Sequence, residues 1–462
     1  MSHKSNLRKI LRQCNANRLP NTRIIAIAFL TIILLGAALL MLPVASRDGQ
    51  CCGVMKALFT ATSATCVTGL VLADTYVQWS GFGQVVIITL IQIGGLGFMS
   101  VVSVFVFMLR KRVGMKRRLL LAQALSLNDT ADVVRLQKHV LVGAFSIEGI
   151  GALVLFFHFL PDYGAITALK WAAFHSVSAF CNAGFDIFGV LQPGSSLMLF
   201  QSDYVVCITL MALIHLGGLG FFVWEELLQK LLSRGKKLLS VYSKLVLICS
   251  AALFLGGTAL IAWMEWANPD TLGDMAWHEK LLAAAFQSTT FRTAGFAALD
   301  QGALRESTKA AGTVLMLIGG SSGSTAGGLK TVTAVVLLAA ALTSARGHTQ
   351  VRLMKRTVND QQIRDAMSLS VIMVALCFWG AVFLTANSGI PFVDALFETS
   401  SAIGTVGLTA NVTPQLHTAS QILLVIFMYF GRVGILTLSL GFLVGDRAEE
   451  RFRYAETKLL IG

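Results

Sequence analysis

A short segment ending in glycine occurs four times in this chain, and this repetition constrains the fold more than any other feature. The copies are Ser63-Ala-Thr-Cys-Val-Thr-Gly69, Ser178-Ala-Phe-Cys-Asn-Ala-Gly184, Thr290-Phe-Arg-Thr-Ala-Gly295 and Ser401-Ala-Ile-Gly-Thr-Val-Gly407. Each follows a short apolar run, at 54–64, 168–179, 280–290 and 392–402. Runs of this length favour re-entrant or buried helices, because a membrane span needs about 20 apolar residues. A phenylalanine precedes the glycine by 10 residues in three copies and by 9 in the third, so we expect a tighter third turn.

Composition places this repeat in a membrane. Of the residues, 55% are hydrophobic and 13% are charged, whereas soluble domains carry about 25% charged residues. Eight longer apolar runs are expected to span the bilayer, at 24–42, 83–108, 140–160, 204–227, 244–266, 313–342, 367–385 and 422–444. The order is span, half-helix, glycine turn and span, repeated four times. The predicted fold class is therefore an all-α integral membrane protein with four pseudo-symmetric repeats.

The basic residues predict the orientation. The formal net charge is +13, but the lysines and arginines gather at the termini and in the loops between repeats, so nucleic acid is not an expected partner. Cytoplasmic loops of membrane proteins are enriched in these residues, so both termini are expected in the cytoplasm of a multi-pass plasma-membrane protein. The expected divisions are the N-terminal segment 1–23, the repeats 24–118, 119–237, 238–357 and 358–446, and the tail 447–462.

The repeated turns suggest a cation filter at a central pore. A dehydrated cation needs oxygens in place of water, and backbone carbonyls supply them without fixed charge. Glycine tolerates the dihedral angles that inward-pointing carbonyls require. The half-helices also direct their partially negative C-termini toward the same axis. The expected filter residues are Val67, Thr68, Gly69, Asn182, Ala183, Gly184, Thr293, Ala294, Gly295, Thr405, Val406 and Gly407.

The sixth span is interrupted by a glycine-rich and serine-rich run at 319–331. A lipid-facing helix containing this run would lose backbone hydrogen bonds, so we expect a loop facing the pore that acts as a gate. Arg432 lies within the eighth span and is expected either to bond the loop carbonyls or to bridge helices. The expected gate residues are Gly319, Gly320, Ser321, Ser322, Gly323, Ser324, Thr325, Ala326, Gly327, Gly328, Lys330 and Arg432.

Other polar residues near these segments have less specific interpretations. Asp74, Asp186 and Asp300 follow three of the turns, where the fourth has Asn411; they either attract cations to an outer mouth or are ordinary loop acids. Glu148 lies in the third span with no partner evident from the sequence. His175 and His215 favour structural roles. No Cys-x-x-Cys or zinc-type cluster occurs in the sequence, so no bound cofactor is expected.

Taken together, these motifs resemble the superfamily of potassium transporters that includes the bacterial Trk and Ktr systems and the plant and fungal Trk/HKT proteins. The resemblance covers about residues 24–462 and includes Thr65-Cys-Val-Thr-Gly-Leu70, Gly404-Thr-Val-Gly-Leu408 and Ser324-Thr-Ala-Gly-Gly-Leu-Lys-Thr331. It implies K⁺ coordination at Gly69, Gly184, Gly295 and Gly407. In the family, serine at the first of these positions accompanies Na⁺ passage, so Gly69 favours K⁺.

The resemblance is closer to the Ktr type, because the chain begins directly with the first repeat. It implies a homodimer on a cytosolic ring of nucleotide-binding regulatory subunits, with ATP or ADP acting only through that partner and Na⁺ as a potential activator. A less selective Na⁺/K⁺ pathway is the alternative within transport. A non-conducting scaffold is a further alternative, whereas no enzyme motif is present in the sequence.

Overall fold

The computed structural model describes residues 21–97, 133–233, 237–348 and 350–434. Parts of the expected second and eighth spans, 98–108 and 435–444, lie outside these residues. So do 1–20 of the basic N-terminal segment, the boundary between the first two repeats, and the tail 447–462. The statements below concern the described residues.

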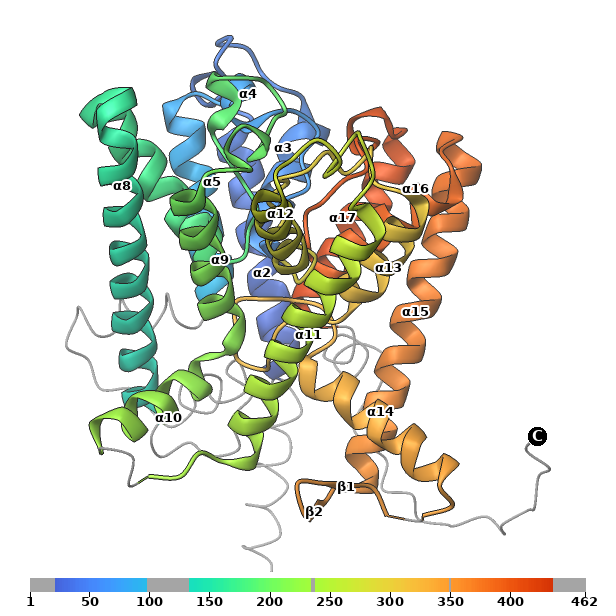
Figure 1. The fold of residues 1–462 in the computed structure, drawn as a ribbon. Coiled ribbons are helices and arrows are strands. Elements are labelled where there is room, and N and C mark those ends of the chain that lie inside the picture. Colours follow the sequence, from blue (N-terminus) through green and yellow to red (C-terminus); the bar gives the residue numbers. More distant parts are fainter. Residues whose placement is uncertain (1–20, 98–132, 234–236, 349, 435–462) are drawn as a thin grey trace, which may run out of the picture.

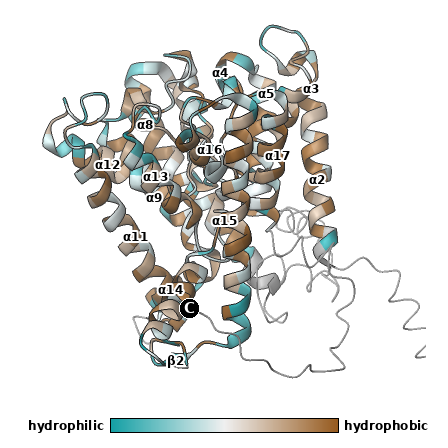
Figure 2. Cartoon of the chain, turned by 90° about the vertical axis from the view of Figure 1, so that its right-hand side faces the viewer, coloured by the Kyte–Doolittle hydropathy of each residue, from teal (hydrophilic) through white to brown (hydrophobic). Residues whose placement is uncertain are grey.

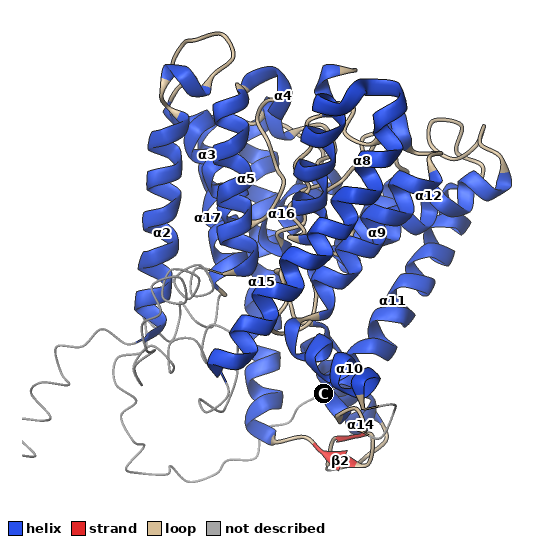
Figure 3. Cartoon of the chain, turned by 90° about the vertical axis from the view of Figure 1, so that its left-hand side faces the viewer, coloured by secondary structure: helices blue, strands red, loops and turns tan. Residues whose placement is uncertain are grey.

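Helices form almost all of the regular structure, and the strands make one short hairpin (Figure 3). The helices are α2 (Asn21–Leu40), α3 (Val54–Cys66), α4 (Thr75–Gln78), α5 (Gly81–Leu96), α8 (Val133–Phe180), α9 (Tyr204–Leu219), α10 (Phe221–Leu232), α11 (Val241–Glu265), α12 (Trp277–Thr290), α13 (Glu306–Leu317), α14 (Thr331–Ala345), α15 (Asp360–Ser388), α16 (Phe392–Gly404) and α17 (Thr418–Val433). The short 3-10 helices are η1 (Pro43–Ala45), η2 (Phe188–Val190), η3 (Met198–Phe200) and η4 (Thr413–Gln415), and the hairpin joins β1 (Arg352–Leu353) to β2 (Arg356–Thr357).

The expected short helices are present before all four turns. Three of them, α3, α12 and α16, are separate elements that lie among the long helices in one half of the molecule (Figure 1). The other half contains α10, α14 and the hairpin. The fourth short helix is the end of α8, which is interrupted at Gly164 with a φ of 75°. A glycine in this conformation turns the chain where an ordinary helical residue would continue it.

The expected span at 204–227 is not one straight helix. α9 ends at Leu219, and α10 continues at 101° to it. Gly220 forms the bend with a φ of 89°, and the Phe221 N–H donates to Gly323 O at 2.9 Å. The prediction was wrong here because apolar composition continues through the bend, whereas a contact with a distant loop redirects the chain.

Three described helices, at 138–180, Val241–Glu265 and Asp360–Ser388, are long and apolar enough to cross a membrane, and the bent pair α9 and α10 makes a fourth if it counts as one span. Four further apolar helices, at 25–40, 81–96, 331–345 and 418–433, are shorter. The outward faces of the bundle are hydrophobic between more hydrophilic ends (Figure 2). Trp263 and Trp379, for example, are 77% and 67% exposed. This distribution suits lipid on the outside, and the number of eight spans stays a prediction.

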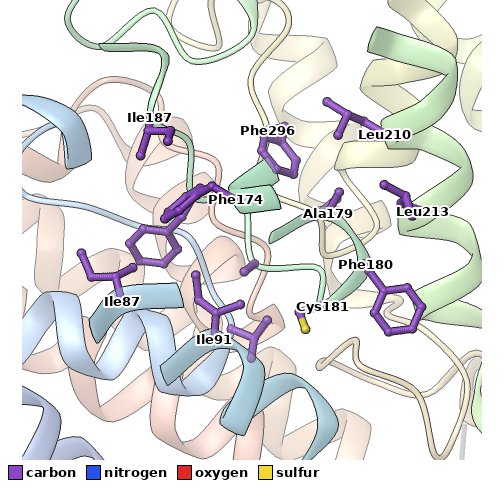
Figure 4. Packing of buried hydrophobic residues seen from close by; sticks show 14 of the residues in the cluster. Ile87, Ile91, Phe174, Ala179, Phe180, Cys181, Ile187, Leu210, Leu213 and Phe296 are labelled. Atoms are coloured by element: carbon purple, nitrogen blue, oxygen red, sulfur yellow. The ribbon is translucent and has the colours of Figure 1, made fainter. Parts of the chain in front are cut away.

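Small residues allow the long helices to approach the short ones closely. A β-carbon at Gly94 of α5 would lie 2.0 Å from Thr65 O, and one at Gly217 of α9 would lie 2.0 Å from Phe180 O. Larger side chains fill the space around these contacts. Ile91 of α5 lies on one side of the end of α8 and Leu213 of α9 on the other (Figure 4). The repeated Gly-Gly motifs therefore mark close helix contacts, as the sequence predicts.

Candidate functional site

The four turn glycines lie next to one another around a common point. A β-carbon at Gly69 would lie 3.3 Å from Gly184 Cα and 3.2 Å from Gly407 Cα. One at Gly184 would lie 2.5 Å from Gly295 Cα, and one at Gly295 would lie 2.7 Å from Val406 O. All four glycines also line one cavity of about 230 Å³. Four segments that are far apart in the sequence therefore form a closed ring.

The four turns share a backbone conformation. The residue two positions before each glycine has a positive φ, with values of 57°, 60°, 61° and 51° at Val67, Asn182, Thr293 and Thr405. Residues with a side chain rarely adopt this left-handed conformation, which costs about 1–2 kcal/mol. Such strain persists only where the surrounding structure enforces it, and it concentrates at functional sites.

The third turn is tighter than the others, as the sequence spacing predicts. In the first, second and fourth turns, the residue before the glycine donates its N–H to a carbonyl five residues earlier. These bonds join Thr68 N to Ser63 O at 2.8 Å, Ala183 N to Ser178 O at 2.8 Å, and Val406 N to Ser401 O at 2.7 Å. In the third turn, Ala294 N bonds Thr290 O, four residues earlier, at 3.2 Å. The missing residue is therefore accommodated within the turn.

Hydroxyl groups at one shared position brace the turns, and the sequence analysis did not assign them this role. Ser63 Oγ and Ser401 Oγ accept hydrogen bonds from the N–H groups of Gly69 and Gly407, both at 3.0 Å. Ser178 Oγ and Thr290 Oγ1 instead donate to Phe185 O and Phe296 O, both at 2.7 Å. The signal in the sequence was the serine or threonine at the start of every copy.

Several buried polar atoms at the ring have no hydrogen-bond partner among the described residues. These atoms are Oγ1 of Thr65, Thr68, Thr293 and Thr405, and Nδ2 of Asn182. Buried polar groups are usually paired with protein or ordered water. Their concentration at the four turns suits a passage whose polar contacts come from water or ions.

The cavity at the ring widens among the acidic residues that follow the turns. Asp74, Asp186, Asp300 and Asn411 all line it. Asp74 also accepts from Tyr76 N and Gly194 N at 2.8 and 2.9 Å, and Asp300 accepts from Asn411 Nδ2 at 2.7 Å. These side chains thus both hold the loops and place negative charge beside the cavity, so the two interpretations from the sequence are compatible.

The sixth expected span is broken where the sequence predicts it, between Leu317 of α13 and Thr331 of α14. The connecting segment 318–330 touches two of the turns. Thr325 Oγ1 donates to Phe180 O at 3.1 Å and Asn182 Oδ1 at 3.2 Å. A β-carbon at Gly327 would lie 2.0 Å from Thr405 Oγ1. This segment, called the crossing loop below, therefore lies directly against the ring.

Arg432 ties the crossing loop to another repeat. Its guanidinium donates to Thr325 O in the loop and to Gly94 O and Gly95 O of α5, the last at 3.1 Å. Lys330 Nζ donates to Ala326 O within the loop at 2.8 Å. The hydrogen bond from Arg432 to a loop carbonyl is therefore present, and the same side chain also bridges to a neighbouring helix. Both interpretations of Arg432 from the sequence apply.

The remaining polar residues have structural partners. Glu148, for which the sequence gave none, accepts from Gln92 Nε2 at 3.0 and 3.1 Å. His175 Nδ1 bonds Trp171 O at 2.7 Å, and His215 Nε2 lies 3.2 Å from Thr289 Oγ1. Among the described residues, no group of three or more histidine, cysteine, aspartate or glutamate side chains has the arrangement of a metal site.

Comparison with known proteins identifies relatives over the full length of the chain. The profile of the TrkH family, described as cation transport protein, matches residues 12–451. The potassium/sodium uptake protein NtpJ of Enterococcus hirae is 38% identical over 458 residues, which cover 98% of this chain and 100% of that protein. The Ktr system potassium uptake protein B of Bacillus subtilis is also 38% identical, over 96% of this chain and 97% of that protein.

A solved structure has the same fold. The crystal structure of the potassium transporter TrkH from Vibrio parahaemolyticus matches with a TM-score of 0.67 and 17% sequence identity, over 91% of this chain and 85% of that chain. This similarity concerns the helical architecture alone. On the family profile and the extent of the sequence relatives, the chain belongs to the TrkH family of cation transport proteins.

Proposed function

We propose that this chain is the ion-translocating subunit of a potassium uptake system. The observation that carries the proposal is the meeting of Gly69, Gly184, Gly295 and Gly407 at one point beside a shared cavity. Carbonyls of the four turns replace the hydration shell of K⁺ at this ring. The printed names of the Enterococcus and Bacillus relatives, which refer to potassium/sodium and potassium uptake, support the choice of ion.

The crossing loop acts as the gate in this proposal. It lies against the second and fourth turns, and Arg432 holds it in place through Thr325 O. The positive charge of Arg432 also opposes cation passage while the loop is closed. Movement of the loop then controls conduction beneath the ring.

The chain is further proposed to function as a plasma-membrane homodimer with both termini in the cytoplasm. The name of the Bacillus relative refers to a Ktr system, which suits a membrane subunit that works with a separate regulatory component. A cytosolic nucleotide-binding ring is the proposed partner, and ATP or ADP acts through it. The repeat boundaries given in the sequence analysis are retained as part of this proposal.

Rubidium uptake into liposomes containing the purified protein tests the proposed transport. External K⁺ is expected to compete with Rb⁺ at lower concentrations than Na⁺. Gly69→Ser is expected to weaken this preference about tenfold or more, because a β-carbon there would lie 2.5 Å from Ala183 O and 3.2 Å from Gly407 Cα. Gly389→Ser is the matched control, since Gly389 also has a positive φ, of 69°, but has no atom within 4 Å of its β-carbon position. Absence of Rb⁺ uptake by folded wild-type protein would refute the proposal.

A less selective Na⁺/K⁺ pathway is the second candidate. The potassium/sodium name of the Enterococcus relative favours it. Equal competition by Na⁺ and K⁺ in the same uptake assay would support this candidate over a K⁺-selective filter. Repeating the assay with and without internal and external Na⁺ distinguishes passage of Na⁺ from activation by Na⁺.

Uptake is expected to depend on pH through Asp186 in the cavity above the ring. Burial, reinforced by the negative charge of Asp74, raises the pKa of Asp186 from 3.8 to about 7. The carboxyl group is therefore neutral below this value and charged above it. One added charge near the ring attracts a cation by about 0.5–1 kcal/mol, so Rb⁺ uptake at low concentration should rise roughly two- to fivefold between pH 6 and pH 8. Asp186→Asn should remove this rise, and an identical profile in the variant would contradict the assignment.

A further inference from the structure

A polar side chain occupies the same position in three of the four short helices. His175 and Glu398 lie nine residues before the turn glycine, and Gln287 lies eight residues before it in the shorter third copy. All three side chains are fully buried. Burying a polar group is costly unless it is hydrogen-bonded, so their partners indicate what these residues do.

Each of these side chains bonds the segment that leaves the ring after the glycine. Ile187 N donates to His175 Nε2 at 3.2 Å, and Ala410 N donates to Glu398 Oε1 at 3.0 Å. Both donors lie three residues after the glycine of their turn. Gln287 and Gln301 exchange two hydrogen bonds, of 2.6 and 3.1 Å. Three repeats therefore connect the short helix behind the ring to the outgoing segment in front of it.

Glu398 makes the most extensive of these connections. Its Oε1 also accepts from Thr409 Oγ1, and its Oε2 accepts from Thr413 Oγ1 at 2.7 Å. All its partners are donors, so they suit a charged carboxylate, for which such bonds are about twice as strong as neutral ones. The held segment borders the ion pathway, because Leu408, Thr409 and Asn411 line the cavity above the ring. Glu398 thus acts through this segment.

We propose that Glu398 is a positioning residue for ion selectivity, with His175 and Gln287 in the corresponding role in the second and third repeats. The inference rests on the proposed function. A turn held only from the side of its helix can widen, because the outgoing segment is free to move. Glu398 fixes that segment and so keeps the carbonyls around Gly407 at the separation that suits K⁺. Selectivity by backbone oxygens requires this control of their positions.

Competition experiments on Rb⁺ uptake in liposomes test the role of Glu398. Glu398→Ala leaves Ala410 N and two threonine hydroxyls without their acceptor and is expected to lower the preference for K⁺ over Na⁺ about tenfold. Glu398→Gln keeps the length of the side chain and an acceptor oxygen, so most of the preference should return. Thr413→Val removes only one of the donors and should give an intermediate loss of preference, which provides a milder variant if Glu398→Ala does not fold.

Glu265→Ala is the matched control for losing a buried carboxylate. Glu265 is also fully buried and accepts from Thr308 Oγ1, Thr271 Oγ1 at 2.8 Å, Asn268 Nδ2 at 2.6 Å and Arg305 N at 3.0 Å. None of these partners belongs to the four turns. Glu265→Ala is expected to lower thermal stability without changing the preference for K⁺.

The possible results separate the two proposals. Wild-type protein without Rb⁺ uptake refutes the transport function itself. Wild-type uptake with an unchanged K⁺ preference in Glu398→Ala and Thr413→Val refutes only the positioning role. Equal loss of Rb⁺ affinity in Glu398→Gln and Glu398→Ala, with selectivity retained, also overturns it and assigns the effect to the charge. A loss of selectivity in Glu265→Ala as large as in Glu398→Ala overturns it as well, because the effect is then general destabilisation.

Discussion

Replacement of Gly407 by alanine is expected to abolish Rb⁺ uptake, with a loss of about a hundredfold or more. The added β-carbon would lie 2.0 Å from Thr68 O and 2.8 Å from Gly69 Cα. The φ of Gly407 is also 96°, which adds strain of about 1–3 kcal/mol for a residue with a side chain. Overpacking costs about 1–3 kcal/mol more. Relief of both requires the first and fourth turns to separate, and this displaces carbonyls from the ring.

Uptake by reconstituted protein, normalised to the amount of folded protein, measures this effect. Gly389→Ala provides the control because Gly389 has a φ of 69° at the end of α15 and open space around its β-carbon position. The control should lose some stability from backbone strain but retain uptake. Wild-type uptake and selectivity in Gly407→Ala would show that ions do not pass through the ring.

Replacement of Arg432 by glutamine is expected to increase Rb⁺ flux through the protein in the absence of any cytosolic partner, by roughly tenfold to a hundredfold. Arg432 joins Thr325 O of the crossing loop to Gly94 O and Gly95 O of α5. A hydrogen bond to a charged group contributes about 1.5–3 kcal/mol. Loss of the tether therefore destabilises the closed loop relative to the open one, and it also removes a positive charge from beside the pathway.

Arg432→Lys separates these two contributions. Lysine keeps the charge but lacks the planar fork of donors that reaches several carbonyls at once. If the tether dominates, Arg432→Lys should also leak, whereas dominance of the charge predicts flux close to that of the wild type. Flux in Arg432→Gln equal to or below the wild-type value, in protein of normal thermal stability, would contradict a role of Arg432 in closing the gate.

Local sequence patterns were sufficient for the main elements of the site. The four turn glycines, the shortened third turn and the break in the sixth span all leave direct traces in residue spacing and composition. Arg432 was also identifiable, because a charge within an apolar run needs a polar partner. The predicted straight continuation of the fourth span failed at Gly220, where a hydrogen bond from Phe221 N to Gly323 O stabilises the bend.

The sequence by itself determined that this chain is a helical membrane protein with four related glycine turns and an interrupted span, since these features depend on neighbouring residues. Only the tertiary structure decided that the turns close into one ring, that Gln92 bonds Glu148, and that Glu398 holds the segment leaving the fourth turn. Hydropathy and spacing report the environment along the chain. Hydrogen bonds between distant segments depend on how the helices pack, and a single sequence does not encode that packing in any local pattern.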